Sequence, residues 1–218
     1  MSRRRIYLMR HAEVAYFDGD GRPVRTADVT LTPAGREQAR AAAAVFEGVR
    51  FDRVVTSGLA RTLETARLVA PGHEPESWPD LREIESGRLR EIPAGELEEA
   101  FVGAFRGRLP EDRRFLGGET IGSLLSRVLP ALERLVEDTS WDVLLAVLHG
   151  AVNRAILSYA LTGERALLGG FEQAPGCINV VDVGHDWVVR AVNVTPADLL
   201  HRTTRLTTME ELFAQYRP

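Results

Sequence analysis

The 218-residue sequence contains no lysine, so arginine supplies all 27 of the basic side chains other than histidine. This absence excludes Schiff-base chemistry, pyridoxal phosphate sites and Walker-type phosphate loops, because each of them depends on a lysine side chain. The only permanent cation left for an anionic ligand is arginine, whose planar guanidinium matches phosphate oxygens two at a time.

Cysteine and long apolar stretches are also scarce. The single cysteine, Cys177, cannot form an internal disulfide, and no apolar N-terminal run indicates secretion. The apolar run Val143–Leu148 is strand-sized, and no stretch approaches the roughly 20 residues that span a bilayer. We therefore expect a soluble, cytoplasmic protein with no membrane partner.

Length and charge narrow the class of protein further. With 218 residues and 44% apolar content, the chain is long enough for one well-buried core, so we expect a single domain over residues 1–218. The net charge of −4 and the pI near 5.8 give no electrostatic argument for a nucleic-acid partner.

Three short apolar segments, each followed by a helical pattern, organise most of the chain. They are Ile6–Met9, Phe51–Ser57 and Val143–Leu148. Their continuous rather than alternating apolar character is typical of strands covered on both faces. The alternation of strands and helices predicts an α/β fold, a three-layer α/β/α sandwich whose central, mostly parallel sheet is flanked by helices.

Helical spacing is clearest in two places. Thr32 and Pro33 offer an N-cap and a first helical position for a helix over residues 34–46. Residues 119–138 repeat apolar side chains at helical spacing, and Pro130 is expected to kink that helix.

Two other segments carry weaker patterns. Residues 177–183 and 187–194 flank Gly184-His185, which predicts a β-hairpin with a two-residue type II′ turn. Residues 88–117 mix proline, glycine and charge without a clear period, and we interpret them as an insertion that acts as a cap over the edge of the sheet.

Polar residues follow each predicted strand at the point where it ends. Because ligands bind at the carboxyl ends of the strands in open α/β sheets, these side chains are expected to meet in one crevice. Two imidazoles and two guanidiniums together are costly unless an anion neutralises them, and phosphate is the obvious anion. The residues are Arg10 and His11, Ser57 and Arg61, and His149 and Gly150.

Five short motifs occur along the chain in a fixed order. They are LMRHAE (Leu8–Glu13), TSGLARTLETA (Thr56–Ala66), LREIESG (Leu81–Gly87), GGET (Gly117–Thr120) and VLHGAVNRAIL (Val147–Leu157). In order and spacing they resemble the motifs of the histidine phosphatase superfamily, also called phosphoglycerate mutase-like, over nearly the whole chain. The resemblance implies the phosphoglycerate mutase-like version of the predicted sandwich.

The resemblance also implies a reaction, the hydrolysis of a small phosphorylated substrate without a metal or other cofactor. His11 would attack phosphorus and form a phosphohistidine, and Glu83 would protonate the leaving oxygen and later activate water. Glu85 is a rival for the acid/base role, but only Glu83 stands four residues before Gly87, as the family motif requires.

The remaining residues of the predicted site would hold the phosphoryl oxygens. Arg10, Arg61 and His149 would stabilise the developing charge. Gly150 and Ser57 would contribute to phosphate binding, although Ser57 is explained equally well as the N-cap of the helix that follows.

The chain departs from the family pattern at positions that bear on substrate choice. Ala12 stands where the family usually has glycine, which the fold tolerates if the backbone φ is negative. Tyr16 and Phe17 occupy the place of an asparagine that touches phosphate, so an aromatic side chain is expected to line the pocket. Arg113 and Arg114 could read a second anionic group of the substrate, or could simply be solvated.

Two other functions remain as alternatives. The first is phosphoglycerate mutase-type transfer, ranked lower because Ile84 follows Glu83 where the mutase motif has arginine. The second is a non-catalytic phospho-ligand binding module, ranked lowest because the full set of expected catalytic residues is retained. The identity of the phosphate ester and the oligomeric state, a homodimer included, are left open by the sequence.

Overall fold

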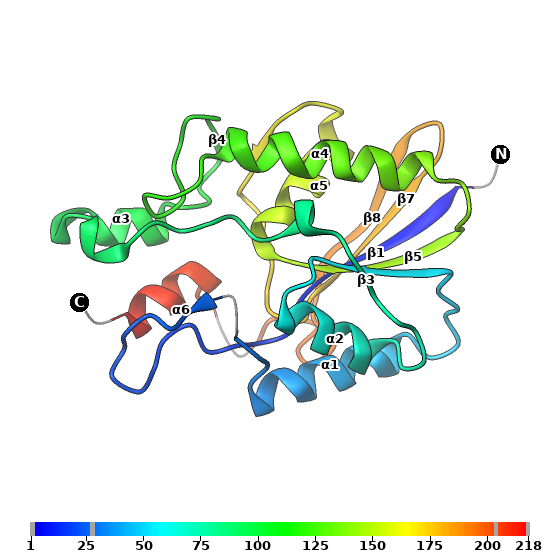
Figure 1. Ribbon diagram of the computed structural model, residues 1–218, viewed down its shortest axis with the longest axis horizontal. Helices are drawn as coiled ribbons and strands as arrows, with labels where there is room; N and C mark the ends of the chain where they lie inside the picture. The colour runs from blue at the N-terminus through cyan, green and yellow to red at the C-terminus, as the bar shows by residue number, and fades with distance from the viewer. Residues whose placement is uncertain (1–2, 27–28, 203–204, 217–218) are drawn as a thin grey trace.

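A six-stranded sheet forms the middle layer of the protein, shown in the computed structural model of Figure 1, which describes residues 3–26, 29–202 and 205–216. The strand order is β3-β2-β5-β1-β7-β8, with β3, β2, β5 and β1 parallel and with β7 and β8 antiparallel to their neighbours. The strands are β1 (Arg4–Arg10), β2 (Arg53–Thr56), β3 (Glu76–Ser77), β5 (Val143–Leu148), β7 (Ile178–Val183) and β8 (Trp187–Val194).

Helices cover both faces of this sheet, so the predicted three-layer α/β/α fold is confirmed. In Figure 1, α1 and α2 lie on one face, and α4 and α5 lie on the other. The helices are α1 (Pro33–Val45), α2 (Ala60–Val69), α4 (Ile121–Glu137) and α5 (Gly150–Thr162).

Strand β5 shows why the sequence reads as continuously apolar. Leu144, Ala146 and Leu148 belong to the core on the α4 and α5 side, whereas Leu145 and Val147 belong to the core on the α1 and α2 side. Successive side chains of a strand point to opposite faces, so a strand covered on both faces must be apolar at every position.

Two of the helices form where the sequence predicted them, whereas the predicted turn of the hairpin differs. Thr32 caps α1 as predicted, accepting a hydrogen bond from the backbone N–H of Gly35. Helix α4 lies within the predicted range and continues through Pro130. The predicted hairpin forms between β7 and β8, but its two-residue type II′ turn is wrong. The connection has three residues, Gly184–Asp186, and Gly184 does not adopt the positive φ that such a turn requires.

The segment 88–117 packs together with the C-terminal helix α6 (Thr208–Gln215), away from the sheet (Figure 1). Phe101 lies against Phe213 and Tyr216, with ring centroids 5.7 Å and 5.9 Å apart, in a small apolar cluster separate from the two main cores. The short elements of the segment are η3 (Leu89–Glu91), η4 (Ala94–Glu96), α3 (Leu97–Val102) and β4 (Arg108–Leu109). Strand β4 pairs with β6 (Leu167–Leu168), and the turn η2 (Pro79–Leu81) packs on α4. In the described part of the chain, no helix has the length and apolar character needed to cross a membrane.

Candidate active site

The ends of β1 and β5 place the two predicted catalytic histidines beside each other. Arg10 pairs in register with Leu148, so the next residues along the two parallel strands are His11 and His149. The backbone N–H of His11 donates to the carbonyl of Leu148 at 2.9 Å, and the two imidazole centroids lie 5.2 Å apart. Both side chains are buried, with exposed fractions of 1% and 0%.

The hydrogen bonds of His11 determine which ring nitrogen is reactive. Nδ1 lies 2.8 Å from the carbonyl oxygen of Ala12, which can only accept, so Nδ1 carries the proton. Nε2 therefore holds the lone pair, and it accepts from the hydroxyl of Tyr16 at 3.3 Å. Burial, and then the charges of Arg61 and Arg10, lower the pKa of His11 well below its usual value of 6.5. The imidazole is thus neutral at pH 7 and able to act as a nucleophile.

A chain of hydrogen bonds runs from His149 through Ser57 and Thr62 to the carbonyl of Leu59, and its directions follow from that last acceptor. Thr62 donates its hydroxyl hydrogen to the carbonyl of Leu59 at 2.8 Å, so Thr62 accepts from the hydroxyl of Ser57 at 3.1 Å. The oxygen of Ser57 then accepts from Nε2–H of His149 at 2.8 Å. This arrangement leaves Nδ1 of His149 as a buried lone pair without a protein partner. Burial first, and then Arg61, lower the pKa of His149 well below its usual value of 6.5.

Ser57 consequently belongs to the site. The alternative that it caps α2 is wrong, because Leu59 occupies the N-cap position and no side chain caps that helix.

Arg10 and Arg61 each keep part of the guanidinium without a protein partner. Arg10 donates from Nη1 to the carbonyl of Gln173 at 2.6 Å and to the hydroxyl of Thr208 at 3.1 Å. Arg61 donates from Nη1 to the carbonyl of Thr26 at 2.8 Å. The Nε atoms of both arginines are buried without a partner. Because unpaired buried N–H groups are costly, these two indicate an anion site. Nδ1 of His149 could donate to the same anion once it is protonated.

Glu83 is the carboxylate that lies against this cluster. Its Oε1 accepts from the backbone N–H of Ile84 at 3.0 Å and of Ala151, in the first turn of α5, at 3.2 Å. A methyl group added at Gly150 would lie 3.7 Å from both Oε2 of Glu83 and Nε of Arg10, so the acid and the cation border the same point. Glu85 also lines the cavity, but its side chain is exposed and makes no comparable contact with α5.

Arg127 on α4 holds the segment that carries Glu83, a role that the sequence analysis missed. Its guanidinium donates to the carbonyl oxygens of Asp80, Arg82 and Glu83 at 2.8, 2.5 and 3.2 Å. It also forms two hydrogen bonds of 3.0 and 2.9 Å with the carboxylate of Glu119. Burial is the largest single influence and would raise the pKa of Glu119. The hydrogen bonds from Arg127, from the backbone N–H of Glu85 and from Ser123, together with the charge of Arg127, outweigh it, so the pKa lies below its usual value.

The GGET motif is the signal that could have revealed this contact. Its glycines allow the backbone to pass close to residues 85–87, and a Cβ at Gly118 would lie 2.2 Å from the carbonyl oxygen of Glu85. The backbone N–H of Glu119 donates to that carbonyl at 2.8 Å. The motif therefore serves the acid-bearing segment and does not touch the phosphate end of the site directly.

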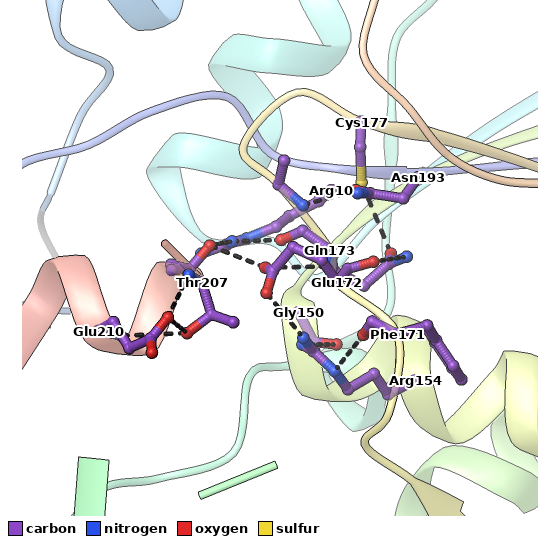
Figure 2. Close-up of polar contacts among 12 residues, drawn as sticks. Arg10, Gly150, Arg154, Phe171, Glu172, Gln173, Cys177, Asn193, Thr207 and Glu210 are labelled. Atoms are coloured by element: carbon purple, nitrogen blue, oxygen red, sulfur yellow. Dashed lines mark hydrogen bonds and ion pairs between the residues drawn. The ribbon is translucent and has the colours of Figure 1, made fainter. Parts of the chain in front are cut away.

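Helix α6 also reaches the site through its first residue, and Figure 2 shows the polar contacts around it. Thr208 donates to Oε1 of Glu172 at 3.0 Å while accepting from Arg10. Glu172 lies 3.7 Å from the guanidinium of Arg154, which also donates to the carbonyl of Phe171 at 3.2 Å. Burial is the main cause that lowers the pKa of Arg154 below its usual value. No sequence signal in α6 pointed to this contact with a catalytic arginine.

A cavity of about 470 Å³ opens above the cluster. Arg10, Arg61, Glu83 and Gly150 line one end of it. The remaining wall comes from the segment 88–117, from α6, from the loop of residues 15–26 and from the neighbours of the four residues, namely Leu59, Arg82, Ile84, Glu85, Ser86, Ala151 and Arg154. His11 and His149 lie beneath these side chains and do not themselves line the cavity.

Several residues singled out from the sequence have other surroundings. Arg113 and Arg114 donate to the carbonyls of Gly103 and Gly118 at 3.0 and 2.8 Å and do not line the cavity, so neither reads a substrate there. Ala12 is fully buried and does not have a positive φ, so the backbone accepts the methyl group as expected. Among the described residues, no cluster of three or more His, Cys, Asp or Glu side chains is placed to hold a metal ion.

Comparison with known proteins agrees with this geometry. The sequence model of the histidine phosphatase superfamily (branch 1) matches residues 6–195. A 6-phosphofructo-2-kinase/fructose-2,6-bisphosphatase of Gallus gallus is 33% identical over 163 residues, which are 72% of this chain and 33% of that protein. A probable phosphoglycerate mutase of Yersinia enterocolitica is 29% identical over 167 residues, covering 72% of this chain and 74% of that protein. The chain thus spans about a third of the length of the first of these relatives.

A solved structure shares the fold. The putative alpha-ribazole-5'-P phosphatase of Escherichia coli superposes with a TM-score of 0.67 at 24% identity, covering 88% of this chain and 97% of that one. The motifs, the paired histidines at the strand ends and the match over residues 6–195 lead to one conclusion: the chain belongs to branch 1 of the histidine phosphatase superfamily.

Proposed function

We propose that the protein is a phosphomonoester hydrolase that works through a phosphohistidine on His11, with arginine side chains rather than a metal neutralising the phosphoryl group. The observation that carries the proposal is the neutral, buried imidazole of His11, whose Nε2 lone pair lies beside two arginines with unpartnered Nε–H groups. A neutral nucleophile and a fixed positive environment are what phosphoryl transfer mainly requires.

In the first step, Nε2 of His11 forms a bond to phosphorus while the bond from phosphorus to the ester oxygen breaks. The proton stays on Nδ1, which goes on donating it to the carbonyl oxygen of Ala12. This hydrogen bond keeps the ring in the reactive tautomer and stabilises the positive charge that develops on it. Arg10 and Arg61 stabilise the equatorial oxygens through the N–H groups that lack protein partners.

His149 changes its protonation state when the anion binds. Its Nδ1 has no partner in the free protein, and its pKa is lowered by burial and by nearby cations. A phosphoryl dianion offsets those cations, so it raises the pKa of His149 and allows Nδ1–H to donate to a phosphoryl oxygen.

Glu83 supplies the proton for the leaving alkoxide and then accepts a proton from the water that attacks the phosphohistidine. The proposal is supported by the position of its carboxylate, which borders the same point as Arg10 at the first turn of α5. Release of phosphate returns His11 to its neutral form and closes the cycle.

Tyr16 contacts the nucleophile in the free protein. Because its hydroxyl donates to Nε2 of His11, phosphorus must displace that hydrogen bond before attack. The hydroxyl then lies next to the incoming phosphoryl oxygens, where it donates to one of them. This takes over the contact that the family asparagine makes.

The segment 88–117 is proposed to act as the cap, in association with α6. Both contribute to the wall of the cavity, and they pack against each other through Phe101.

Phosphate release from a panel of monoesters tests the proposal. Activity should persist in the presence of a chelator and fall at least about 10⁴-fold in His11→Ala, because a nucleophile cannot be replaced by water in a buried site. His185→Ala, which changes an exposed histidine in the β7–β8 connection, is the matched control and should retain full activity. Undiminished turnover by His11→Ala would overturn the proposal.

The relative named as a probable phosphoglycerate mutase makes mutase activity the second function to test. Incubation with 3-phosphoglycerate separates the two, because a mutase equilibrates it with 2-phosphoglycerate and a hydrolase releases phosphate. We expect phosphate release without equilibration.

A further inference from the structure

The cavity is much larger than a phosphoryl group requires. Pockets of about 300–1,000 Å³ typically enclose a drug-sized ligand, and this one measures about 470 Å³. Arg10, Arg61 and Glu83 occupy only the end next to the histidines, so most of the volume lies where the leaving group of a bound ester would be.

Apolar and aromatic side chains from segments far apart in the sequence form much of the wall around that volume, beside Arg82, Glu85 and Ser86. The loop of residues 15–26 contributes Phe17, the segment 88–117 contributes Leu89, Phe105 and Phe115, and α6 contributes Met209 and Leu212. Phe105 and Phe115 lie with their ring centroids 5.5 Å apart, so two aromatic faces form part of one side. Such a surface binds hydrocarbon by removing it from water and gives a polyhydroxy chain few partners.

Arg154 is a buried cation where the wall meets the phosphate end, since its Nη1 would lie 3.4 Å from a methyl group added at Gly150, and the protein already neutralises it. Its guanidinium lies 4.4 Å from the ring centroid of Phe105 and is bound by the carbonyls of Phe171 and Gly150 at 3.2 and 3.3 Å. Glu172 supplies the opposite charge at 3.7 Å. A second phosphate or a carboxylate on the leaving group would have to compete with Glu172 for this arginine.

We infer that the substrate is a phosphomonoester whose alcohol carries a bulky, uncharged, largely apolar group of aromatic or fused-ring size, which the segment 88–117 and α6 enclose. The inference rests on the proposed hydrolase function and names its substrate class. It disfavours small polar esters such as glycerol phosphates and phosphoglycerates, and it disfavours bisphosphates. Arg154 then serves to fix the position of Phe105 rather than to bind an anion.

The test compares esters of alcohols with similar leaving-group reactivity and different size. We expect kcat/KM for 2-(1-naphthyl)ethyl phosphate to exceed that for ethyl phosphate and for glycerol 3-phosphate by at least about 30-fold, because each buried methylene equivalent is worth about a factor of four. Equal or faster hydrolysis of glycerol 3-phosphate would overturn the inference.

A variant in the wall locates the selectivity. Leu212 on α6 is half-buried, and Leu212→Asn should lower kcat/KM for the naphthyl ester about 10-fold while changing that for ethyl phosphate less than about twofold. The matched control is Leu161→Asn, which changes a leucine that is 53% exposed on α5 and does not line the cavity. Equal losses on both esters would contradict the assignment of α6 to the leaving-group wall.

A binding measurement tests the substrate class independently of the proposed hydrolase function. The wild-type protein is titrated calorimetrically with 3-(1-naphthyl)propylphosphonate and with propylphosphonate, neither of which can be hydrolysed. Binding of the naphthyl compound at least about 30-fold more tightly supports the substrate class even if no ester is turned over, in which case only the hydrolase function fails. Equal binding of the two phosphonates overturns the inference even if esters are hydrolysed.

Discussion

The two ends of the cavity are built in different ways. The phosphate end comes from the carboxyl ends of β1, β2 and β5 and from the first turn of α5, all anchored in the central sheet. The leaving-group end comes from a loop, the segment 88–117 and α6, which pack on one another around Phe101. Under the proposed function, the strand ends and α2 hold the nucleophile and the cations, and the outer wall surrounds the leaving group. We therefore expect most changes in the outer wall to affect substrate choice more than chemistry.

Few residues connect the two ends, and they are the ones that test the comparison. Arg127 ties the acid-bearing segment to α4, Thr208 ties α6 to Arg10, and Tyr16 joins the loop of residues 15–26 to His11. A substitution confined to the phosphate end should alter kcat, and one confined to the leaving-group end should alter selectivity between esters. For a connecting residue, the quantity that changes shows which end the residue serves.

After His11, the largest effect is expected at Glu83. Glu83→Gln should lower kcat for alkyl phosphates about 10²–10³-fold, because the alkoxide then leaves without a proton, and much less for p-nitrophenyl phosphate, whose leaving group needs none. Glu85→Gln, two residues away and exposed, is the matched control and should stay within about threefold of wild type. Steady-state kinetics on both esters decide the assignment, and a larger loss in Glu85→Gln would reverse it.

A smaller effect is expected at Arg127. Arg127→Met removes the hydrogen bonds to the carbonyls of Asp80, Arg82 and Glu83, so the acid loses its fixed position and kcat should fall about 10–100-fold. Tungstate binding should be nearly unchanged, because the cations that hold an oxyanion lie elsewhere. The control is Arg134→Met, at a second arginine of α4. It removes an exposed ion pair with Asp80 and should change kcat less than about twofold. Weaker tungstate binding in Arg127→Met would indicate general structural damage instead.

Removal of the Tyr16 hydroxyl should lower kcat a few fold. Tyr16→Phe removes the hydroxyl next to Nε2 of His11 and keeps the ring, so kcat should fall about 3–10-fold, the value of one hydrogen bond. Selectivity between naphthyl and ethyl esters should not change, which assigns the hydroxyl to the phosphate end. If selectivity changes and kcat does not, Tyr16 belongs to the leaving-group wall.

The smallest effect expected is the uptake of a proton when an oxyanion binds. Burial and nearby cations lower the pKa values of His11 and His149, so both are neutral in the free protein at pH 7.5. A bound dianion raises the pKa of His149, so tungstate binding should take up a proton, to a limit of about one per site. Calorimetric titration in two buffers of different ionisation enthalpy measures this number. Zero uptake, or uptake that persists in His149→Gln, would contradict the role given to Nδ1.

The phosphate end could be predicted from the sequence because its determinants are local. The apolar runs fix where β1 and β5 end, and the residue after each strand is then a histidine whose partner lies in register across the sheet. The choice of Glu83 over Glu85 likewise came from a spacing, and the position of Glu83 beside Arg10 and α5 is consistent with it.

At the leaving-group end the sequence predicted only that an aromatic residue lines the cavity, as Tyr16 and Phe17 do. Its other contacts depend on tertiary packing between distant segments: Thr208 is 198 residues from Arg10 in the sequence, and nothing in α6 itself indicates that its first turn meets this arginine. Arg127 looks like an ordinary solvated arginine on α4 until the backbone carbonyls of residues 80–83 are placed beside it. The three-residue connection after β7 shows the same limit on a smaller scale, since Gly184 alone did not define the turn.

Trapping the covalent intermediate tests the central claim most directly. The protein is mixed with a ³²P-labelled monoester, quenched in alkali so that phosphohistidine survives, and mapped by mass spectrometry. The account predicts label on His11, attached through Nε2, and none in His11→Ala. Turnover of the ester without any labelled histidine, or label on His149 instead, would contradict it.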